Sequence, residues 1–305
     1  WVVGEVLIDL IPDGSDRTPI VGGGPANTAK GLSKLGINTQ FIDGISTDDY
    51  GQMAKDELVA SGVKLEFVKY SDKPTCLAIV TLSDSGSASY DFVIQNTATF
   101  DFNSAWLPNP HTERPLLLHI GTLATAIEPG ASVLFKWAQS VAKIAPIVFD
   151  PNIRPAVVSD RVQYVAQVER WVSISSAIKV SDDDIKWLYP SLELDQVVTN
   201  WLSIGPKLIV VTYGERGLTG FRSGEKIKVE AVRVKVGDTV GAGDTVGAIL
   251  VEAIVKEGLS QLSGVRLEKM LNRAAAAAAL TVSRSGANPP TPGEIEASIP
   301  ATENN

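Results

Sequence analysis

The sequence has 305 residues and a formal net charge of −8, and 44% of its residues are apolar while 20% are charged. Proteins that bind nucleic acids usually show a basic excess, so this charge argues against a nucleic-acid partner. The single cysteine, Cys76, excludes an intramolecular disulfide and favours a reducing compartment. No apolar run approaches the roughly 20 residues of a membrane span. We therefore expect a cytoplasmic protein that makes no contact with a membrane.

Strand-like and helix-like segments alternate along most of the chain. Apolar β-type runs predict strands at residues 1–11, 39–45, 116–120, 146–150, 177–180, 207–212, 217–222 and 226–234. Helical patterns lie at residues 25–35, 50–61, 129–143, 160–172, within 182–203, at 242–257 and at 267–283. The first of these helices begins at Pro25 and stops before Gly36, as the usual placement of proline and glycine predicts. Such alternation indicates an α/β fold whose mostly parallel sheet is covered by helices on both faces.

Two stretches interrupt this alternation. Residues 75–82 and 88–94 are β-type runs on either side of "SDSGS", which is a hairpin signal. Together with residues 11–21 they predict a small sheet that projects from the main body, built from segments near 11–21 and 74–95. The most linker-like stretch is "PNPHTERP" at residues 108–115, but alternation continues across it. We therefore treat residues 1–305 as a single domain.

The most informative stretch is "GDTVGAGD", residues 237–244, which comes just before a predicted helix. The first N–H groups of a helix have no internal partner and lie at the positive end of the helix dipole. Gly241 and Gly243 lack a Cβ, so consecutive amides there can turn toward one anion. On these grounds alone Asp244 is either a residue that stabilises the helix start or a base that accepts a proton from a hydroxyl group.

Two other glycine motifs fit this stretch poorly. A P-loop requires Gly-Lys-Ser/Thr after its glycines, and the sequence contains no such tripeptide. A dinucleotide-binding motif follows the first strand of a βαβ unit, whereas this stretch lies near the end of the chain. The dehydrogenase interpretation is therefore the weaker one.

Five motifs in this order resemble one family over essentially the whole chain: "GEVLIDLIP", "GGGPANTAKGLSKLG", "DPNIRP", "VTYGERG" and "DTVGAGD". On these motifs the chain is identified as a member of the ribokinase-like (PfkB) carbohydrate kinases and is most similar to their fructokinase branch. The resemblance implies a three-layer α/β/α fold with a mostly parallel central sheet and a small β-sheet lid. It also implies an ATP-dependent sugar kinase that uses Mg²⁺ and phosphorylates a primary hydroxyl, with fructose as the leading acceptor.

The resemblance also implies a role for individual residues. Asp244 becomes the catalytic base, and the amides of Gly241, Ala242 and Gly243 become the anion hole. The residues implied to bind the substrate are Asp9, Gly23, Gly24, Asn27, Asn152 and Arg154, with Arg154 near the transferred phosphate. The residues implied to bind the nucleotide are Lys179, Thr212, Gly214 and Gly217. The family's acidic "NxxE" element is here "SDDD", with Ser181 in place of Asn, so that Asp184 would act on magnesium through water.

Several alternatives remain open at this point. The acceptor can be 2-keto-3-deoxygluconate, ribose or another sugar, because the same motifs serve several sugars. A different class of function is a non-catalytic sugar or nucleotide sensor on the kinase fold, which a loss of metal use at "SDDD" would favour. By resemblance, the lid also pairs between subunits to form a homodimer.

Overall fold

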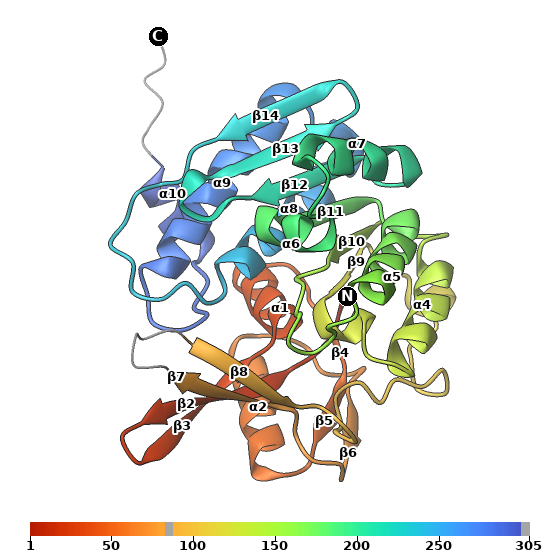
Figure 1. Cartoon of the computed structure of the whole chain (residues 1–305), viewed down its shortest axis with the longest axis vertical. Coiled ribbons are helices and arrows are strands. Elements are labelled where there is room, and N and C mark those ends of the chain that lie inside the picture. Colours follow the sequence, from red (N-terminus) through yellow and green to blue (C-terminus); the bar gives the residue numbers. More distant parts are fainter. Residues whose placement is uncertain (83–87, 300–305) are drawn as a thin grey trace.

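The computed structural model describes residues 1–82 and 88–299. Its largest element is an eight-stranded sheet (Figure 1), whose strands in spatial order are β14 (Glu225–Val229), β13 (Leu218–Arg222), β12 (Leu208–Thr212), β11 (Ala177–Ser181), β10 (Ile147–Asp150), β9 (Leu118–Gly121), β1 (Val2–Val3) and β4 (Phe41–Ile42). The strands from β12 to β4 are parallel, whereas β13 and β14 are antiparallel to their neighbours. The predicted mostly parallel sheet is thus confirmed.

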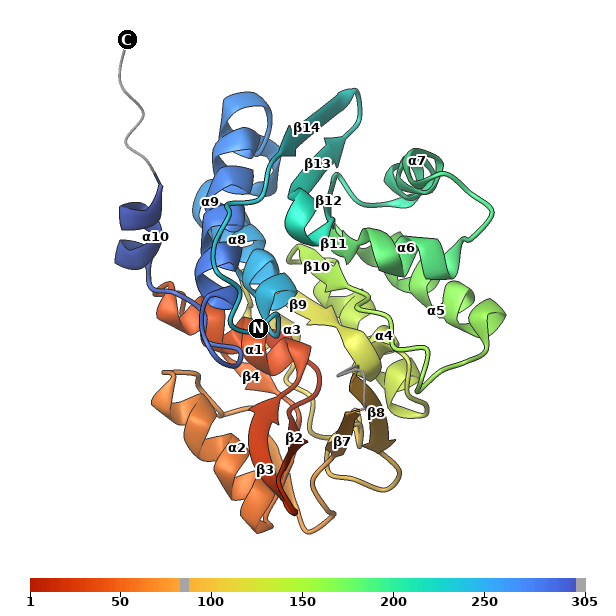
Figure 2. The same ribbon diagram turned by 60° about the vertical axis from the view of Figure 1, so that its left-hand side comes forward.

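Helices cover both faces of this sheet (Figure 2). One face carries α1 (Gly24–Lys34), α8 (Ala242–Glu257) and α9 (Gly264–Val282), and the other carries α4 (Gly130–Val141), α5 (Arg161–Ile174), α6 (Asp182–Leu188) and α7 (Leu194–Ile204). Consecutive strand residues point to opposite faces. Val148 therefore joins the apolar core beneath α8, while Ile147 and Phe149 join the core on the other side. The three-layer α/β/α arrangement is confirmed.

A second sheet has four strands in the order β3 (Asp16–Gly22), β2 (Leu7–Asp13), β7 (Leu77–Leu82) and β8 (Ala88–Val93). The strands of this small sheet come from the two regions from which the sequence predicts a small sheet, near 11–21 and 74–95. Its pairing places Asp9 between Ile20 and Ala78. The "SDSGS" signal, residues 83–87, lies outside the described residues. Helix α2 (Asp49–Ala60) packs against β2 and β3, and Figure 1 shows this small sheet below the body of the molecule.

Two predicted strands are each divided in the structure. Residues 1–11 form β1 and the beginning of β2, and the chain passes from the large sheet to the small one at Gly4, which has φ 141°. Residues 39–45 contain β4 and the start of β5 (Gly44–Ser46), which pairs with β6 (Lys69–Ser71) instead of the large sheet. Most residues of both runs are buried on each side of the break, so the pattern of burial along the sequence does not reveal it.

The remaining elements are short: α3 (Pro110–Glu113), α10 (Pro292–Ser298) and the 3₁₀ turns η1 (Thr122–Thr125), η2 (Gly214–Arg216) and η3 (Leu259–Gln261). The predicted strand at 226–234 ends early, because residues 230–241 form no regular element. Within residues 1–82 and 88–299, no helix has both the length and the apolar character needed to cross a membrane.

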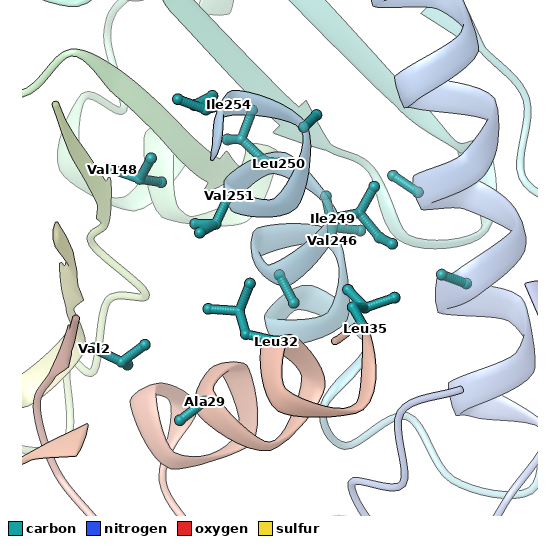
Figure 3. Close-up of a cluster of buried hydrophobic side chains, with 14 of the residues drawn as sticks. Val2, Ala29, Leu32, Leu35, Val148, Val246, Ile249, Leu250, Val251 and Ile254 are labelled. Carbon is teal, nitrogen blue, oxygen red and sulfur yellow. The ribbon is translucent and has the colours of Figure 1, made fainter. Parts of the chain in front are cut away.

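Helix α8 is more deeply buried than its sequence indicates. An apolar face was predicted from Val246, Ile249, Leu250, Ala253 and Ile254, but every residue from 244 to 254 is buried. The reason is that α8 lies between α1, α9 and the sheet (Figure 3), so that it has neighbours on several sides. Gly31 of α1 faces Ala248 of α8 so closely that a Cβ at position 31 would lie 3.1 Å from the Ala248 methyl. This packing fixes the start of α8 relative to the start of α1.

Candidate active site

The start of α8 combines free amides with a buried carboxylate. Gly241 is the residue before the first helical turn and has φ 80°, a left-handed conformation that favours glycine. A Cβ there would also lie 2.7 Å from the Ala287 methyl. The amide of Ala242 donates to the Thr239 carbonyl over a long 3.4 Å, whereas first-turn amides such as that of Gly243 have no acceptor inside the helix. An anion at this point would meet the Gly243 amide, which has no acceptor inside the helix, and the weakly engaged amide of Ala242.

The carboxyl group of Asp244 is held from the neighbouring helix. Nδ2 of Asn27 donates a 2.9 Å hydrogen bond to Oδ2 of Asp244, and Oδ1 of Asn27 is buried without a protein partner in the described chain. Burial raises the pKa of Asp244, and the positive charge of Lys179 is the largest effect that opposes this rise. A carboxylate in such surroundings is a stronger base than one in water.

Lys179 lies directly beneath the amides of this turn. Its Nζ is 3.0 Å from Oδ2 of Asp150, and both side chains are about 95% or more buried. A Cβ added to Gly243 would be only 2.7 Å from the same Nζ. Burial raises the pKa of Asp150 to about 6. The ammonium of Lys179 therefore adds a fixed positive charge to the free amides at the start of α8.

The "DPNIRP" loop follows β10 and is held by a carboxylate from α6. Oδ1 of Asp184 accepts from the Ile153 amide at 2.9 Å, while its Oδ2 accepts from the Ser181 amide at 3.2 Å. Asn152 has φ 39°, and its Oδ1 accepts a 2.7 Å hydrogen bond from Nη1 of Arg154. Asp184 thus anchors the loop that carries two of the predicted sugar-binding residues.

Asp9 approaches the same region from the small sheet. It is partly buried, and its carboxyl group has no hydrogen-bond partner within the described chain. Burial raises its pKa to about 6 against the opposing charge of Arg154. Its carboxyl group lies across Gly22, where any Cβ would collide with it. Gly23 has φ 105°, and a Cβ there would collide with the carbonyl of Glu5. The glycines before α1 therefore leave room for Asp9 and for the chain that carries it.

Gly24 marks the point where several predicted residues meet. A Cβ built on it would lie 3.0 Å from Nδ2 of Asn152 and 3.2 Å from Oδ1 of Asp244. The structure therefore brings together Gly24, Asn27, Asn152 and Asp244, which come from α1, the loop after β10 and α8. The carboxyl ends of parallel strands meet at one edge of a sheet, and this is the common position for sites in such folds.

Thr212, Gly214 and Gly217 form a separate part of the same edge. Thr212 ends β12, and the turn into β13 contains Gly214 with φ 58° and Gly217 with φ 90°. A Cβ on Gly217 would collide with the Val229 carbonyl, while a Cβ on Gly214 would have no neighbour within 4 Å. In the described part of the chain these three residues form no hydrogen bond with Asp244, so they lie in a strand turn apart from the Asp244 carboxyl group.

One residue beside Lys179 was not singled out from the sequence. Asp150 is part of the quoted "DPNIRP" motif, and its charged pairing with Lys179 depends on the register of β10 and β11, which no sequence pattern shows. Asp238, which begins the "DTVGAGD" motif, accepts hydrogen bonds of 3.0 Å from the amides of Val240 and Gly286 and so stabilises its own loop. Within the described residues, no group of three or more His, Cys, Asp or Glu side chains is placed to hold a metal ion.

Comparison with known proteins places this geometry in a family. The model of the pfkB family carbohydrate kinases matches residues 1–293. The chain belongs to the PfkB family of carbohydrate kinases. A fructokinase of Rhizobium leguminosarum bv. trifolii is 34% identical over 263 residues, which cover 84% of this chain and 79% of the relative. The predicted family and kinase class are thus confirmed.

Solved structures show the same fold. A fructokinase with bound ATP from Xylella fastidiosa superposes with a TM-score of 0.91 at 23% identity, covering 98% of this chain and 97% of that one. A fructokinase from Vibrio cholerae O395, solved with fructose, ADP and calcium ion, has a TM-score of 0.85 at 23% identity and covers 97% of both chains. The PfkB kinase described here therefore shares its architecture with fructokinases over nearly its full length.

Proposed function

We propose that this PfkB kinase is an ATP-dependent fructokinase that phosphorylates a primary hydroxyl of fructose. The observation that carries the proposal is the buried Asp244 carboxylate, which Asn27 orients beside the free amides at the start of α8. A relative at 34% identity is named a fructokinase, which favours fructose among the sugars that this family phosphorylates. The whole chain is treated as one kinase unit with the small sheet as its lid.

The proposed chemistry follows from the positions of the residues. Asp9, Asn27, Asn152 and Arg154 hold the sugar hydroxyls, with Gly23 and Gly24 leaving space for the ring. Asp244 accepts the proton of the attacking hydroxyl as the oxygen bonds to the γ-phosphorus of ATP and the bond to ADP breaks. The amides of Gly241, Ala242 and Gly243 stabilise the charge on the transferred phosphoryl group, and Lys179 adds its positive charge from below.

Fewer protein groups are assigned to the nucleotide and the metal ion than to the sugar and the phosphoryl group. Thr212, Gly214 and Gly217 line the edge where the nucleotide is expected. Oδ1 of Asp150 is buried without a partner in the described chain, and each oxygen of Asp184 already accepts one backbone amide. This set fits a Mg²⁺ ion held mainly by ATP phosphates, with Asp150 and Asp184 reaching it through water. The ion would neutralise charge on the phosphates.

The decisive experiment is a coupled assay of ADP release with ATP, Mg²⁺ and a panel containing fructose, ribose, 2-keto-3-deoxygluconate and glucose. Fructose should give the highest kcat/KM, and Asp244→Asn should lower kcat roughly 10²-fold or more. The exposed Asp183→Asn serves as the matched control and should keep wild-type rates. Wild-type rates in Asp244→Asn would contradict the role of Asp244 as the catalytic base. A higher kcat/KM for another sugar of the panel would make that sugar the acceptor in place of fructose.

A sensor and a dimer are tested separately. Sugar binding by calorimetry without ADP release from any panel member would favour the non-catalytic sensor. For the homodimer through the lid, Val93 of β8 is a 43% exposed apolar residue at the sheet edge. Sedimentation should show a dimer, and Val93→Glu should shift it toward monomer. Cytoplasmic placement remains a prediction from composition, which fractionation of cells expressing the full-length protein would test.

A further inference from the structure

Glu5 is a buried carboxylate that the proposed chemistry does not use. It is 3% exposed and lies where the chain passes from β1 to β2. The hydroxyl of Thr122 donates to its Oε1, and the amide of Ala124 donates to its Oε2 at 3.2 Å. Its own main-chain carbonyl faces Gly23 so closely that a Cβ at position 23 would collide with it. Glu5 therefore contacts both the turn after β9 and the glycine turn before α1.

Thr122 has an unusual backbone for a β-branched residue. It follows the last residue of β9 and has φ 55°, in the left-handed region that such residues rarely adopt. Residues held in such conformations persist only where their surroundings fix them, and they are frequent at functional sites. Here Glu5 accepts hydrogen bonds from two residues of the η1 turn, and the hydroxyl of Thr125 donates to the Thr122 carbonyl at 2.7 Å.

The side chain of Thr122 reaches the point where the candidate site residues meet. Its methyl carbon lies 3.0 Å from the Cβ position of Gly24. That same position is 3.0 Å from Nδ2 of Asn152 and 3.2 Å from Oδ1 of Asp244. One methyl group thus stands beside an amide donor and a carboxylate at the place proposed for the sugar. Because the Thr122 hydroxyl donates to Glu5, the hydrogen bond determines which part of the side chain faces Gly24.

We propose that Thr122 is a specificity-determining residue for the acceptor sugar and that Glu5 is the positioning residue that holds it. This inference rests on the proposed sugar kinase function. The Thr122 methyl forms an apolar wall that packs on a C–H face of the sugar beside the reacting hydroxyl. A sugar that directs a hydroxyl at this wall would lose a hydrogen bond to water without gaining one, so the wall disfavours it.

The test compares three substitutions in the full-length enzyme. Thr122→Ser keeps the hydroxyl and its bond to Glu5 but removes the methyl. Thr125→Ser is the matched control, because it removes a methyl from the same buried turn and keeps its hydroxyl bond. Glu5→Gln keeps the size of the positioning residue but removes its charge. Each variant is assayed for kcat and KM over the sugar panel, and its Tm is measured with and without sugar.

For Thr122→Ser we expect a several-fold rise in KM for fructose, little change in kcat and a narrower ratio of kcat/KM between fructose and the other sugars. Glu5→Gln should narrow the same ratio and also lower Tm, while Thr125→Ser should leave the ratio unchanged. An active, folded Thr122→Ser enzyme with the wild-type ratio would overturn the inference.

The role of Thr122 can be tested even if the proposed kinase function fails. If the wild-type protein phosphorylates no sugar, the kinase proposal fails, and the shift of Tm by each sugar still reports on Thr122. In that case Thr122→Ser should reorder those shifts. Unchanged shifts, or no shift with any sugar, would overturn the role of Thr122.

Discussion

Asn27 and Asp244 are 217 residues apart in the chain, yet Nδ2 of Asn27 donates a 2.9 Å hydrogen bond to Oδ2 of Asp244. The two residues lie in the first turns of α1 and α8, which pack against each other along their length. A second contact joins the same turns, because the Thr28 hydroxyl lies 3.5 Å from the main-chain carbonyl of Asp244. The packing of two helices therefore sets the orientation and the basicity of the proposed base.

The bond from Asn27 should set the pH dependence of the reaction. Burial raises the pKa of Asp244, and the hydrogen bond from Asn27 lowers it by stabilising the ionised form. Asn27→Leu removes that stabilisation, so the pKa of Asp244 should rise further and less of the base should be ionised at a given pH. We expect the acid limb of kcat/KM for fructose to move to higher pH by about one unit.

Thr28→Val is the control for this prediction, since Thr28 contacts the main chain of Asp244 and not its carboxyl group. Its acid limb should remain at the wild-type pH. If the acid limb of kcat/KM for folded Asn27→Leu stays at the wild-type pH, Asn27 does not influence the pKa of Asp244.

Asp9 should lower the free energy of unfolding at neutral pH while it contributes to substrate binding. Burial raises its pKa to about 6 from an ordinary value of 3.8. Because the folded-state pKa is the higher one, the associated stability is fully present below pH 3.8 and is lost as the pH rises through 6. Asp9→Asn has no such loss. Its free energy of unfolding should therefore exceed that of the wild type by about 1–3 kcal/mol at pH 7.5 and by much less at pH 4.

Thermal or urea unfolding across this pH range checks the difference, and the coupled assay should show a raised KM for the sugar in Asp9→Asn. Asp13→Asn, at the exposed end of the same strand, is the control and should change neither quantity. A constant difference in stability between Asp9→Asn and wild type at pH 4 and 7.5 would contradict the raised pKa.

The sequence was sufficient to predict which segments meet at the site. The resemblance of "DPNIRP", "SDDD" and "GDTVGAGD" to the family's motifs implied that they serve one site, and the structure places them at the ends of strands or the starts of helices. What it could not predict were pairs set by packing and register. The contact of Lys179 with Gly243 depends on how deeply β11 lies beneath α8, and no local pattern records that depth.

Packing that leaves no local pattern in the sequence also explains where the predicted strands and helices differ from the structure. The chain between β1 and β2 changes sheets at Gly4, but the valines before it and Val6 and Leu7 after it are equally buried, so burial does not mark the change. Helix α8 shows a predicted apolar face, and the small residues Gly247 and Ala248 on its other sides are buried as well. Small residues have little hydrophobic signal, so close packing around a helix is underestimated by a pattern of large apolar residues.

Asp184 should act first as an anchor of the loop after β10. Its two oxygens accept from the amides of Ile153 and Ser181, and Asp184→Asn would replace one acceptor with an amide donor. One of the two backbone amides would then lose its partner, which should cost about 1–3 kcal/mol of unfolding free energy. The kcat should also fall, because Asn152 and Arg154 lie in the loop that Asp184 anchors.

Unfolding and kinetic assays of Asp184→Asn are compared with those of the exposed neighbour Asp183→Asn, which should be neutral. The Mg²⁺ concentration that gives half the maximal rate separates the two roles of Asp184. If Asp184→Asn raises this Mg²⁺ concentration by more than any change in its affinity for ATP explains, the result supports contact between Asp184 and the ion through water. If both stability and rate match the wild type, the anchoring role is wrong.

Two glycines of α8 offer the sharpest comparison, because the same change to alanine should lower kcat at Gly243 and leave it unchanged at Gly247. A Cβ on Gly243 would lie 2.7 Å from Nζ of Lys179 and displace the ammonium from the start of the helix. We expect Gly243→Ala to lower kcat at least tenfold by disturbing the charge beneath the anion hole. A Cβ on Gly247 would lie 3.6 Å from Nε2 of His119, an ordinary contact distance.

Gly247→Ala should therefore retain the wild-type kcat. Replacing a glycine inside a helix by alanine also favours the helix, so its unfolding free energy should rise by up to about 1 kcal/mol. Assays of ADP release and urea unfolding on the two variants provide the measurement. Equal losses of kcat in both would mean that α8 tolerates no added methyl group anywhere, and the special position of Lys179 under Gly243 would lose its support.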